Sequence, residues 1–145
     1  MTTDGFTIER TFDAPRDLVW KALTEPAQFA VWFGGDHAEV PVDSVSMDVR
    51  PGGTWAAHMI AGGAEMDWKG EYVEVDEPAR LVFTITDQPD NPARDTITVT
   101  LAENDGKTDM TYHQGGGNLD AAGYEQAKQG TGTFLDKLEE LVTSR

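Results

Sequence analysis

A chain of 145 residues with 39% hydrophobic residues, among them four Trp and six Phe, is long enough for one globular domain and too apolar to stay disordered. Its net charge of −15 opposes binding to nucleic acids and to anionic membranes, because both depend on lysine and arginine. The absence of cysteine excludes disulfides, thiolate metal sites and cysteine nucleophiles, and the absence of a signal-peptide pattern or a long apolar run predicts a cytoplasmic protein.

The beginning of the chain predicts one strand followed by two short helices. Apolar side chains alternate over residues 6–12, which is typical of a strand with one buried face. Pro15 then opens a helix, since the missing N–H of a proline costs nothing at a helix start. Pro26 opens a second short helix, which we expect to end before the glycine pair at 34–35.

Six further strands are predicted between these helices and the last long segment. Apolar and polar side chains alternate along them, and the turns between them are rich in glycine, proline, asparagine and aspartate. The expected strands cover residues 37–50, 54–60, 66–72, 81–86, 97–101 and 110–112. The strongest hairpin signal is Asn104-Asp105-Gly106. A meander of this length with one apolar face needs a cover.

The segment 119–142 predicts the one long helix, which can supply that cover, with Asn118 or Asp120 as its cap. Its apolar positions follow steps of three and four residues: Tyr124, Ala127, Thr131, Phe134, Leu135, Leu138, Leu141 and Val142. Gly130 and Gly132 each cost up to about 1 kcal/mol inside a helix, and we explain them by close approach to the sheet or by a kink. Because a helix about 10–12 Å across cannot fill a strongly curved sheet, we expect space between the two.

Several motifs, in this order, resemble one known superfamily over essentially the whole chain. They are Phe12-Asp-Ala-Pro15, Val19-Trp20, Leu23-Thr24-Glu-Pro26, Trp32-Phe33, Val49-Arg50-Pro51-Gly52-Gly53, Gly70-Glu-Tyr72, Arg80-Leu81-Val82-Phe83 and Gly123-Tyr-Glu-Gln126. The chain resembles the SRPBCC or START-like helix-grip superfamily, which includes START lipid-transfer domains, birch-pollen-type allergens and aromatic polyketide cyclases. Within it, the chain is similar to the bacterial branch related to the carboxy-terminal domain of the activator of heat-shock-protein-90 ATPase.

The resemblance implies an α+β helix-grip fold as a single domain over residues 1–145. Two short helices follow the first strand, and a curved antiparallel sheet of six or seven strands surrounds the long C-terminal helix. Members of the branch often carry tryptophan after the helix glycine, where this chain has Thr131. A smaller residue there would enlarge the space beneath the helix or let another side chain occupy it.

The resemblance does not by itself carry a chaperone function over to this chain. In the eukaryotic activator this fold is the trailing domain, and much of the chaperone contact comes from a leading domain. We expect no such leading domain in a chain of 145 residues, so co-chaperone activity does not transfer with the fold.

Histidine and acidic residues give no catalytic or metal-binding pattern. His37, His58 and His113 are not spaced as metal ligands, and a general base at His58 is a weaker alternative to a solvent-facing side chain. Asp48 and Arg50, two apart on one strand face, predict a surface ion pair. No triad order, phosphate loop or dinucleotide fingerprint is present. We therefore expect no metal, no cofactor and no catalytic residue.

Aromatic residues give the better lead to function. With the expected strand phases, the space between sheet and helix is reached by Trp32, Phe33, Trp55, Met59, Trp68, Phe83, Tyr112, Tyr124, Thr131 and Phe134. These side chains either fill the core or line a pocket in which tyrosine hydroxyls orient a ligand.

We favour a non-catalytic protein, monomeric or homodimeric, that binds a small apolar or aromatic molecule of drug size. One alternative is a polyketide cyclase- or dehydratase-like enzyme that uses the same cavity, and the other is a protein-interaction domain acting on a chaperone. Convergent buried ionisable groups would favour the enzyme, and an exposed apolar patch would favour the interaction domain.

Overall fold

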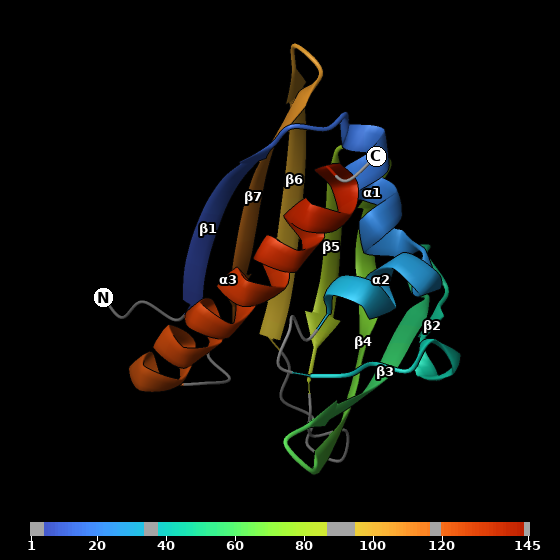
Figure 1. Ribbon diagram of the computed structural model, residues 1–145, viewed down its shortest axis with the longest axis vertical. Coiled ribbons are helices and arrows are strands. Elements are labelled where there is room, and N and C mark those ends of the chain that lie inside the picture. Colours follow the sequence, from blue (N-terminus) through green and yellow to red (C-terminus); the bar gives the residue numbers. More distant parts are fainter. Residues whose placement is uncertain (1–4, 34–37, 87–94, 117–119, 144–145) are drawn as a thin grey trace.

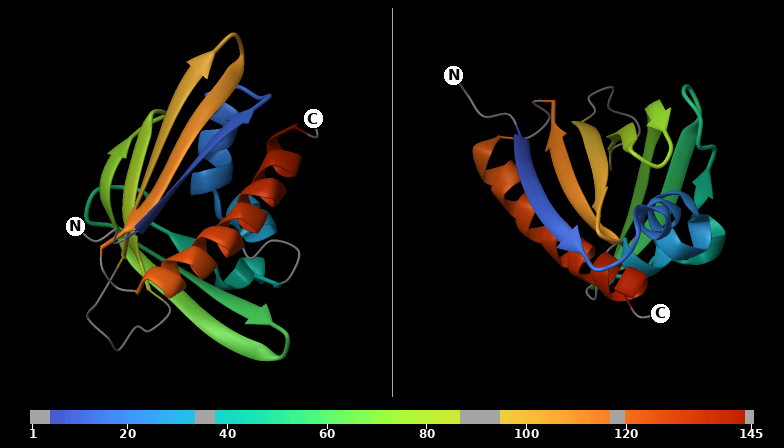
Figure 2. Two further views of the ribbon diagram at one scale, coloured as in Figure 1. Left: turned by 90° about the vertical axis from the view of Figure 1, so that its left-hand side faces the viewer. Right: turned by 90° about the horizontal axis from the view of Figure 1, so that it is seen from above.

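A curved antiparallel sheet surrounds one long helix, and all three helices lie on the concave side of the sheet (Figures 1 and 2). The computed structural model describes residues 5–33, 38–86, 95–116 and 120–143. Its elements are β1 (Gly5–Phe12), α1 (Arg16–Thr24), α2 (Pro26–Trp32), the 3₁₀ helix η1 (Val42–Ser44), β2 (Ser46–Met47), β3 (Thr54–Ala61), β4 (Ala64–Asp76), β5 (Arg80–Ile85), β6 (Asp95–Asn104), β7 (Lys107–Gly115) and α3 (Ala121–Thr143).

The seven strands form one sheet in the order β1-β7-β6-β5-β4-β3-β2. The first strand therefore pairs with the last, and every neighbouring pair is antiparallel. Helix α3 contacts β1, α1 and α2, so it ties the start of the sheet to the two short helices. This architecture confirms the predicted α+β helix-grip fold. No helix in the described ranges combines the length and apolarity that a membrane crossing demands.

The helix starts and hairpin turns follow the predicted signals closely. Pro26 is the first residue of α2, while Pro15 stands one residue before α1 with an extended backbone. Asp120 caps α3, because its Oδ1 accepts a hydrogen bond of 2.7 Å from the backbone N–H of Gly123. The other predicted cap, Asn118, and the glycine pair at 34–35 lie outside the described residues.

The turn between β6 and β7 shows why the hairpin signal was strong. Asp105 has a φ of 54° and Gly106 has a φ of 79°, so both central residues of the turn are left-handed. Such a turn matches the twist of the flanking strands, and aspartate followed by glycine is a sequence that tolerates it. The predicted hairpin is confirmed.

The long strand predicted over residues 37–50 is mostly wrong. The structure has a single bridge at Glu39 and only the two-residue strand β2. Between them the 3₁₀ helix η1 forms, because the Ser44 hydroxyl and the Ser44 N–H both donate to the Pro41 carbonyl, at 2.6 and 3.0 Å. The predicted ion pair of Asp48 and Arg50 is present at 2.8 Å between exposed side chains, although it lies beyond β2 and not on a strand.

The explanation that the α3 glycines permit close approach to the sheet is wrong. A Cβ on Gly130 would meet no atom of the described residues within 4 Å, outside the backbone of the helix itself. A Cβ on Gly132 would come near only the Arg10 guanidinium, at 3.8 Å. The helix also runs through both positions without interruption. Among the described residues, open space and not a tight contact therefore lies beside the Cβ position of Gly130.

Candidate functional site

A pocket of about 200 Å³ lies between α3 and the neighbouring ends of β5, β6 and β7. It is lined by Phe33, Trp68, Ile85, Thr86, Asp95, Tyr112, Gln114, Ala127, Gly130, Thr131 and Phe134. Ala127, Gly130 and Thr131 share one face of α3, since they are three to four residues apart. The helical wall of the pocket is therefore built largely from small side chains, at the place where Gly130 has open space around it.

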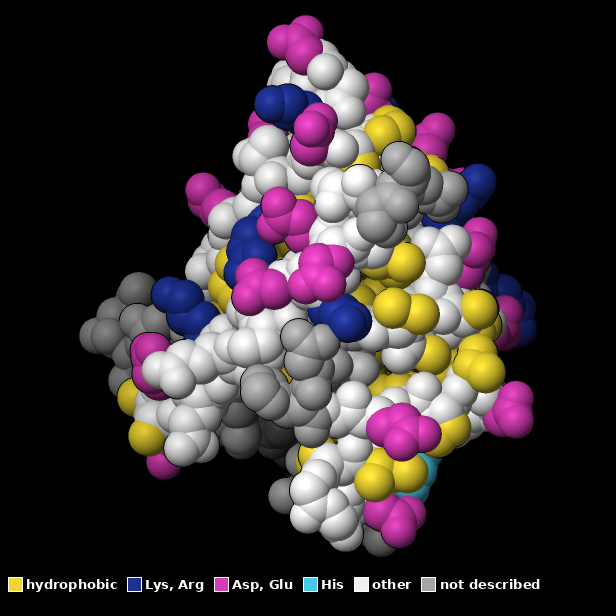
Figure 3. Space-filling model, viewed as in Figure 1, with side chains coloured by type: hydrophobic (Ala, Val, Ile, Leu, Met, Phe, Trp, Pro, Cys, Tyr) yellow, Lys and Arg dark blue, Asp and Glu magenta, His cyan; other side chains and the backbone are white. Residues whose placement is uncertain are grey.

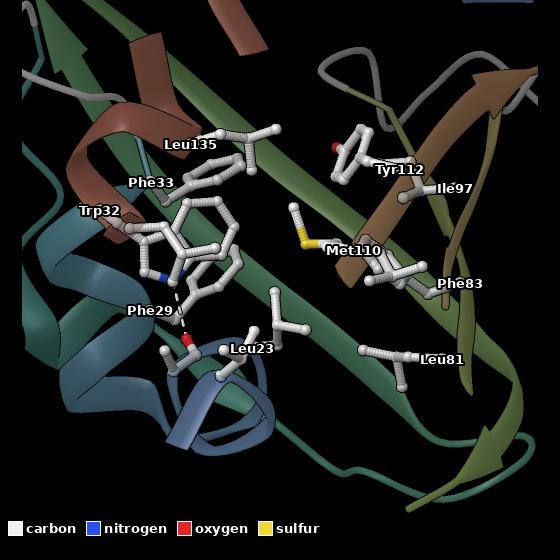
Figure 4. Close-up of a cluster of buried hydrophobic side chains, with 14 of the residues drawn as sticks. Leu23, Phe29, Trp32, Phe33, Leu81, Phe83, Ile97, Met110, Tyr112 and Leu135 are labelled. Atoms are coloured by element: carbon white, nitrogen blue, oxygen red, sulfur yellow. Dashed lines mark hydrogen bonds between the residues drawn. The ribbon is translucent and has the colours of Figure 1, made fainter. Parts of the chain in front are cut away.

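Half of the predicted ligand-binding residues line this pocket: Phe33, Trp68, Tyr112, Thr131 and Phe134. Phe33 follows α2, and its ring centroid lies 5.8 Å from that of Trp68 and 5.4 Å from that of Phe134. Figure 4 shows Tyr112 projecting from β7, with its hydroxyl toward the side on which Phe33 and Leu135 lie. Aromatic side chains from a loop, two strands and α3 thus meet around the same space.

The other half do not line it: Trp32, Trp55, Met59, Phe83 and Tyr124. The Trp32 indole donates to the Ala22 carbonyl at 2.7 Å, the dashed line in Figure 4, and the Trp55 indole donates to the Thr84 carbonyl at 2.9 Å. Both tryptophans, with Met59 and Phe83, belong to the buried hydrophobic core. The predicted residues therefore all lie in or against the core, and half of them also line the pocket.

Tyr124 lies behind the pocket and holds a polar group that lines it. Its hydroxyl donates to Asp95 Oδ1 at 2.8 Å, while Gln114 Nε2 donates to Asp95 Oδ2 at 3.0 Å. All three side chains are buried, and Asp95 is only 1% exposed. The pocket thus has one polar end in walls that are otherwise mostly apolar.

Sequence reasoning missed Asp95 and Gln114, although the strand periodicity reaches both. Asp95 continues the inward row that contains Ile97 and Val99 on β6, and Gln114 follows Tyr112 on the inward face of β7. A residue two positions from a buried one points to the same face. Charged and amide side chains at strand ends are ordinarily exposed, which is why neither residue was assigned to the interior.

Tyr112 adds a hydroxyl group to the pocket lining. Among the described residues this hydroxyl has no hydrogen-bond partner. Burial raises the pKa of Tyr112 well above its ordinary value, because a phenolate is poorly stabilised away from water. The hydroxyl is therefore protonated near neutral pH and can both donate and accept a hydrogen bond.

The volume and lining of the pocket suit a small aromatic molecule. An apolar cavity of about 150 Å³ is enough to bind benzene, so about 200 Å³ accommodates one or two fused rings. This is below the volumes, about 300 Å³ or more, that are typical of drug-sized ligands. Within the described residues no cluster of three or more His, Asp or Glu side chains is arranged to hold a metal ion.

The histidines lie away from this pocket or outside the described residues. His37 falls in an undescribed segment, and His113 Nδ1 lies 2.8 Å from the Thr7 hydroxyl on the exposed face of the sheet. His58 of β3 stands between two carboxylates of β4, with Nδ1 2.7 Å from Asp67 and Nε2 2.8 Å from Glu65. His58 does not line the pocket, so the geometry gives no support for a general base there.

The His58 cluster predicts a pH-dependent contribution to stability. Hydrogen bonds that protonated His58 donates to the carboxylates of Asp67 and, second, of Glu65 raise the pKa of His58 above its usual 6.5. A group whose pKa is higher in the folded state than in the unfolded state stabilises the fold. Its full contribution is present at pH values below the unfolded pKa and is lost as the pH rises through the folded pKa. We expect His58→Gln to lower the free energy of unfolding most near pH 5, and progressively less up to about pH 9.

Urea denaturation of wild type and of His58→Gln, from about pH 5 to about pH 9, measures the difference in their free energies of unfolding. His113→Gln is the matched control, because His113 contacts a threonine hydroxyl and not a carboxylate. A difference that grows toward alkaline pH would contradict the assignment of a charged His58 between Asp67 and Glu65.

Comparison with known proteins relates this fold to other chains. The family described as "Activator of Hsp90 ATPase homolog 1-like protein" matches residues 13–143. Protein CV1439 from Chromobacterium violaceum is 25% identical, with 96% of each chain covered and a TM-score of 0.85. Protein NE0264 from Nitrosomonas europaea is 26% identical, with 97% of this chain and 95% of that chain covered and a TM-score of 0.84.

A more distant structure shares the fold alone. PFC0360w, an Hsp90 activator from Plasmodium falciparum, is 19% identical over 96% of each chain, with a TM-score of 0.72. No curated protein matches the chain.

Proposed function

This chain belongs to the family of activator of Hsp90 ATPase homolog 1-like proteins, and we propose that it binds a small apolar or aromatic molecule between α3 and the sheet. The observation that carries this proposal is the pocket of about 200 Å³, whose walls combine aromatic rings with the small side chains of Ala127, Gly130 and Thr131. Space of this size next to a closely packed core is uncommon, because protein interiors seldom leave voids larger than a water molecule.

The expected affinity follows from the area that such a ligand buries. A molecule of one or two rings hides about 250 Å² of apolar surface, which at about 25 cal/mol per Å² gives about 6 kcal/mol. The pocket walls add a comparable area, while lost motion of the ligand costs at least about 4 kcal/mol. Affinities from micromolar to high micromolar are therefore expected.

Filling the pocket from the helix tests the proposal. Thr131→Trp introduces an indole at a position that lines the pocket together with Phe33, Trp68 and Phe134. We expect at least about a tenfold loss of affinity for the probe 1-naphthol, with stability kept or raised, because the new side chain occupies the binding volume.

A titration followed by two-dimensional NMR measures both the affinity and the fold. Gln129→Trp is the matched control, because position 129 is exposed on the same turn of α3. Equal affinity of folded Thr131→Trp and wild type would place the binding site elsewhere.

Catalysis in the same pocket is the second candidate function. Two buried ionisable side chains, Asp95 and Tyr112, line this pocket, and Tyr124 contacts Asp95 from behind it; buried ionisable groups in a pocket are typical of active sites. Mass spectrometry of small molecules that co-purify with the protein separates the two candidates. Recovery of one unchanged molecule supports binding, and its conversion on incubation with fresh protein supports an enzyme of the cyclase or dehydratase type.

A chaperone-linked interaction surface has weaker support. Among the described residues the large hydrophobic side chains that are exposed are Val31, Val42 and Val73. Figure 3 shows acidic side chains spread over one face of the molecule, with hydrophobic side chains gathered on its right-hand part, near α2. Nothing in this arrangement identifies a partner, so we keep the pocket as the basis of the proposed function.

A further inference from the structure

The geometry points to a ligand that carries a hydrogen-bond donor: we propose that the pocket selects an aromatic molecule of one or two rings whose hydroxyl or amine group donates to Asp95. This inference rests on the proposed function and specifies the chemical class of the ligand. It follows from the polar end of the pocket, where Asp95, Gln114 and Tyr112 line the same space.

The polar end is produced by the register of two strands. The inward rows are buried from Asp95 to Leu101 on β6 and from Thr108 to Gln114 on β7, and each row reaches the pocket with a polar residue. Ile97 of β6 pairs with Gln114 of β7, so Asp95, two residues before Ile97, is the diagonal neighbour of Gln114. The hydrogen bond of 3.0 Å between Gln114 and Asp95 joins these neighbours.

A second contact orients the Asp95 carboxyl group from the helix. The Tyr124 hydroxyl of α3 donates to Oδ1, while Gln114 donates to Oδ2, so each oxygen is held from a different element. Such a group is preorganised, because ligand binding does not have to order it. Both Asp95 oxygens act as acceptors in these two contacts, so a ligand group that binds to them must donate a hydrogen bond.

Tyr112 complements this requirement. Its hydroxyl, without a partner among the described residues, both donates and accepts, so it can bond a ligand hydroxyl or amine alongside Asp95. A ligand carboxylate would place acceptor oxygens against the acceptor oxygens of Asp95 and would lose its own hydration in a mostly apolar pocket, and both effects disfavour its binding. The site is thus built to accept a donor and to reject an anion.

The remaining walls fix the aromatic part of the ligand. Phe33, Trp68 and Phe134 supply rings and Ile85 supplies an aliphatic side chain. Planar molecules pack well against such rings in stacked or edge-on arrangements. A volume of about 200 Å³ leaves room for a naphthalene-sized molecule and little more.

Four naphthalenes of matched size test this selectivity: 1-naphthol, 1-naphthylamine, 1-methylnaphthalene and 1-naphthoate. The wild-type protein should bind the first two at least about tenfold more tightly than 1-methylnaphthalene, and 1-naphthoate most weakly. NMR titration gives each dissociation constant. Equal affinities for 1-naphthol and 1-methylnaphthalene, or tight binding of 1-naphthoate, would overturn the inference.

Two variants assign the selectivity to the polar end. Asp95→Asn should reduce the preference for 1-naphthol over 1-methylnaphthalene to less than about threefold, because an amide nitrogen, which cannot accept, replaces one of the two acceptor oxygens. Tyr112→Phe keeps the ring and loses only a hydroxyl that has no hydrogen-bond partner among the described residues, so it should fold even where Asp95→Asn does not. It should lower the same preference while leaving the affinity for 1-methylnaphthalene unchanged. An unaltered preference in folded Asp95→Asn, or in Tyr112→Phe, would contradict the assignment.

The failure of this inference is distinguishable from a failure of the proposed function. If none of the four molecules binds, the proposed function loses its support. If all four bind equally, and Thr131→Trp abolishes that binding, the pocket is the binding site but its polar end does not select the ligand.

Discussion

Gly70→Ala should destabilise the protein by about 2–6 kcal/mol, because the strand position admits no side chain. Gly70 of β4 pairs with Trp55 of β3, and the Trp55 indole crosses over it to donate to the Thr84 carbonyl at 2.9 Å. A Cβ on residue 70 would overlap the Thr84 carbonyl oxygen and lie 2.6 Å from Trp55 Nε1. Overpacking costs about 1–3 kcal/mol, and a buried donor left unpaired costs about 1–3 kcal/mol more.

Urea denaturation of Gly70→Ala and Gly130→Ala measures the contrast between a filled and an open glycine position. Gly130→Ala should stabilise by up to about 1 kcal/mol, because its Cβ meets no atom of the described residues and alanine favours the helix. If Gly70→Ala changed the free energy of unfolding as little as Gly130→Ala does, Trp55 would not pack over Gly70 as described.

Leu138→Ala should destabilise by about 2–5 kcal/mol. Leu138 lies on α3, is 0% exposed and belongs to the core between helix and sheet. Truncation leaves a cavity that the surroundings fill only partly, so the loss exceeds the transfer free energy of the removed carbons.

Glu140→Ala is the matched control on the same helix, because residue 140 is exposed and should change the free energy of unfolding by less than about 0.5 kcal/mol. Chemical denaturation of Leu138→Ala and Glu140→Ala measures the loss in free energy of unfolding for each variant. Equal losses for both variants would mean that another face of α3 packs on the sheet.

Much of the fold could be predicted because each element carries its own local signal. The inward positions of β3, represented by Trp55, Ala57 and Met59, alternate with partly exposed ones, and the buried side of α3 follows steps of three and four residues. Turns such as Asp105-Gly106 require left-handed backbone, which few residue types accept. The segment before β2 escaped this reasoning, because Val40 and Val45 are buried without forming a long strand, while Val42 between them is exposed.

The candidate site could be predicted only in part, because periodicity gives the face of a side chain and not its depth. Trp55, Phe83 and Tyr112 all belong to the buried core, yet among these three only Tyr112 also lines the pocket. The hydrogen bond between Asp95 and Tyr124 is a tertiary contact, because the two residues are 29 positions apart in the chain and lie on a strand and on a helix. No local pattern in the sequence records such a contact.

The position of a bound ligand is the most direct test of the central claim that the space under α3 is a binding site. Nuclear Overhauser effects between the ring protons of 1-naphthol and protein methyl groups report contacts of a few ångströms. The account predicts such effects to Ile85, Ala127 and Thr131, which line the pocket from the sheet and from the helix. Effects confined to the exposed methyl groups of Val31 and Val42, with none to the pocket methyl groups, would contradict it.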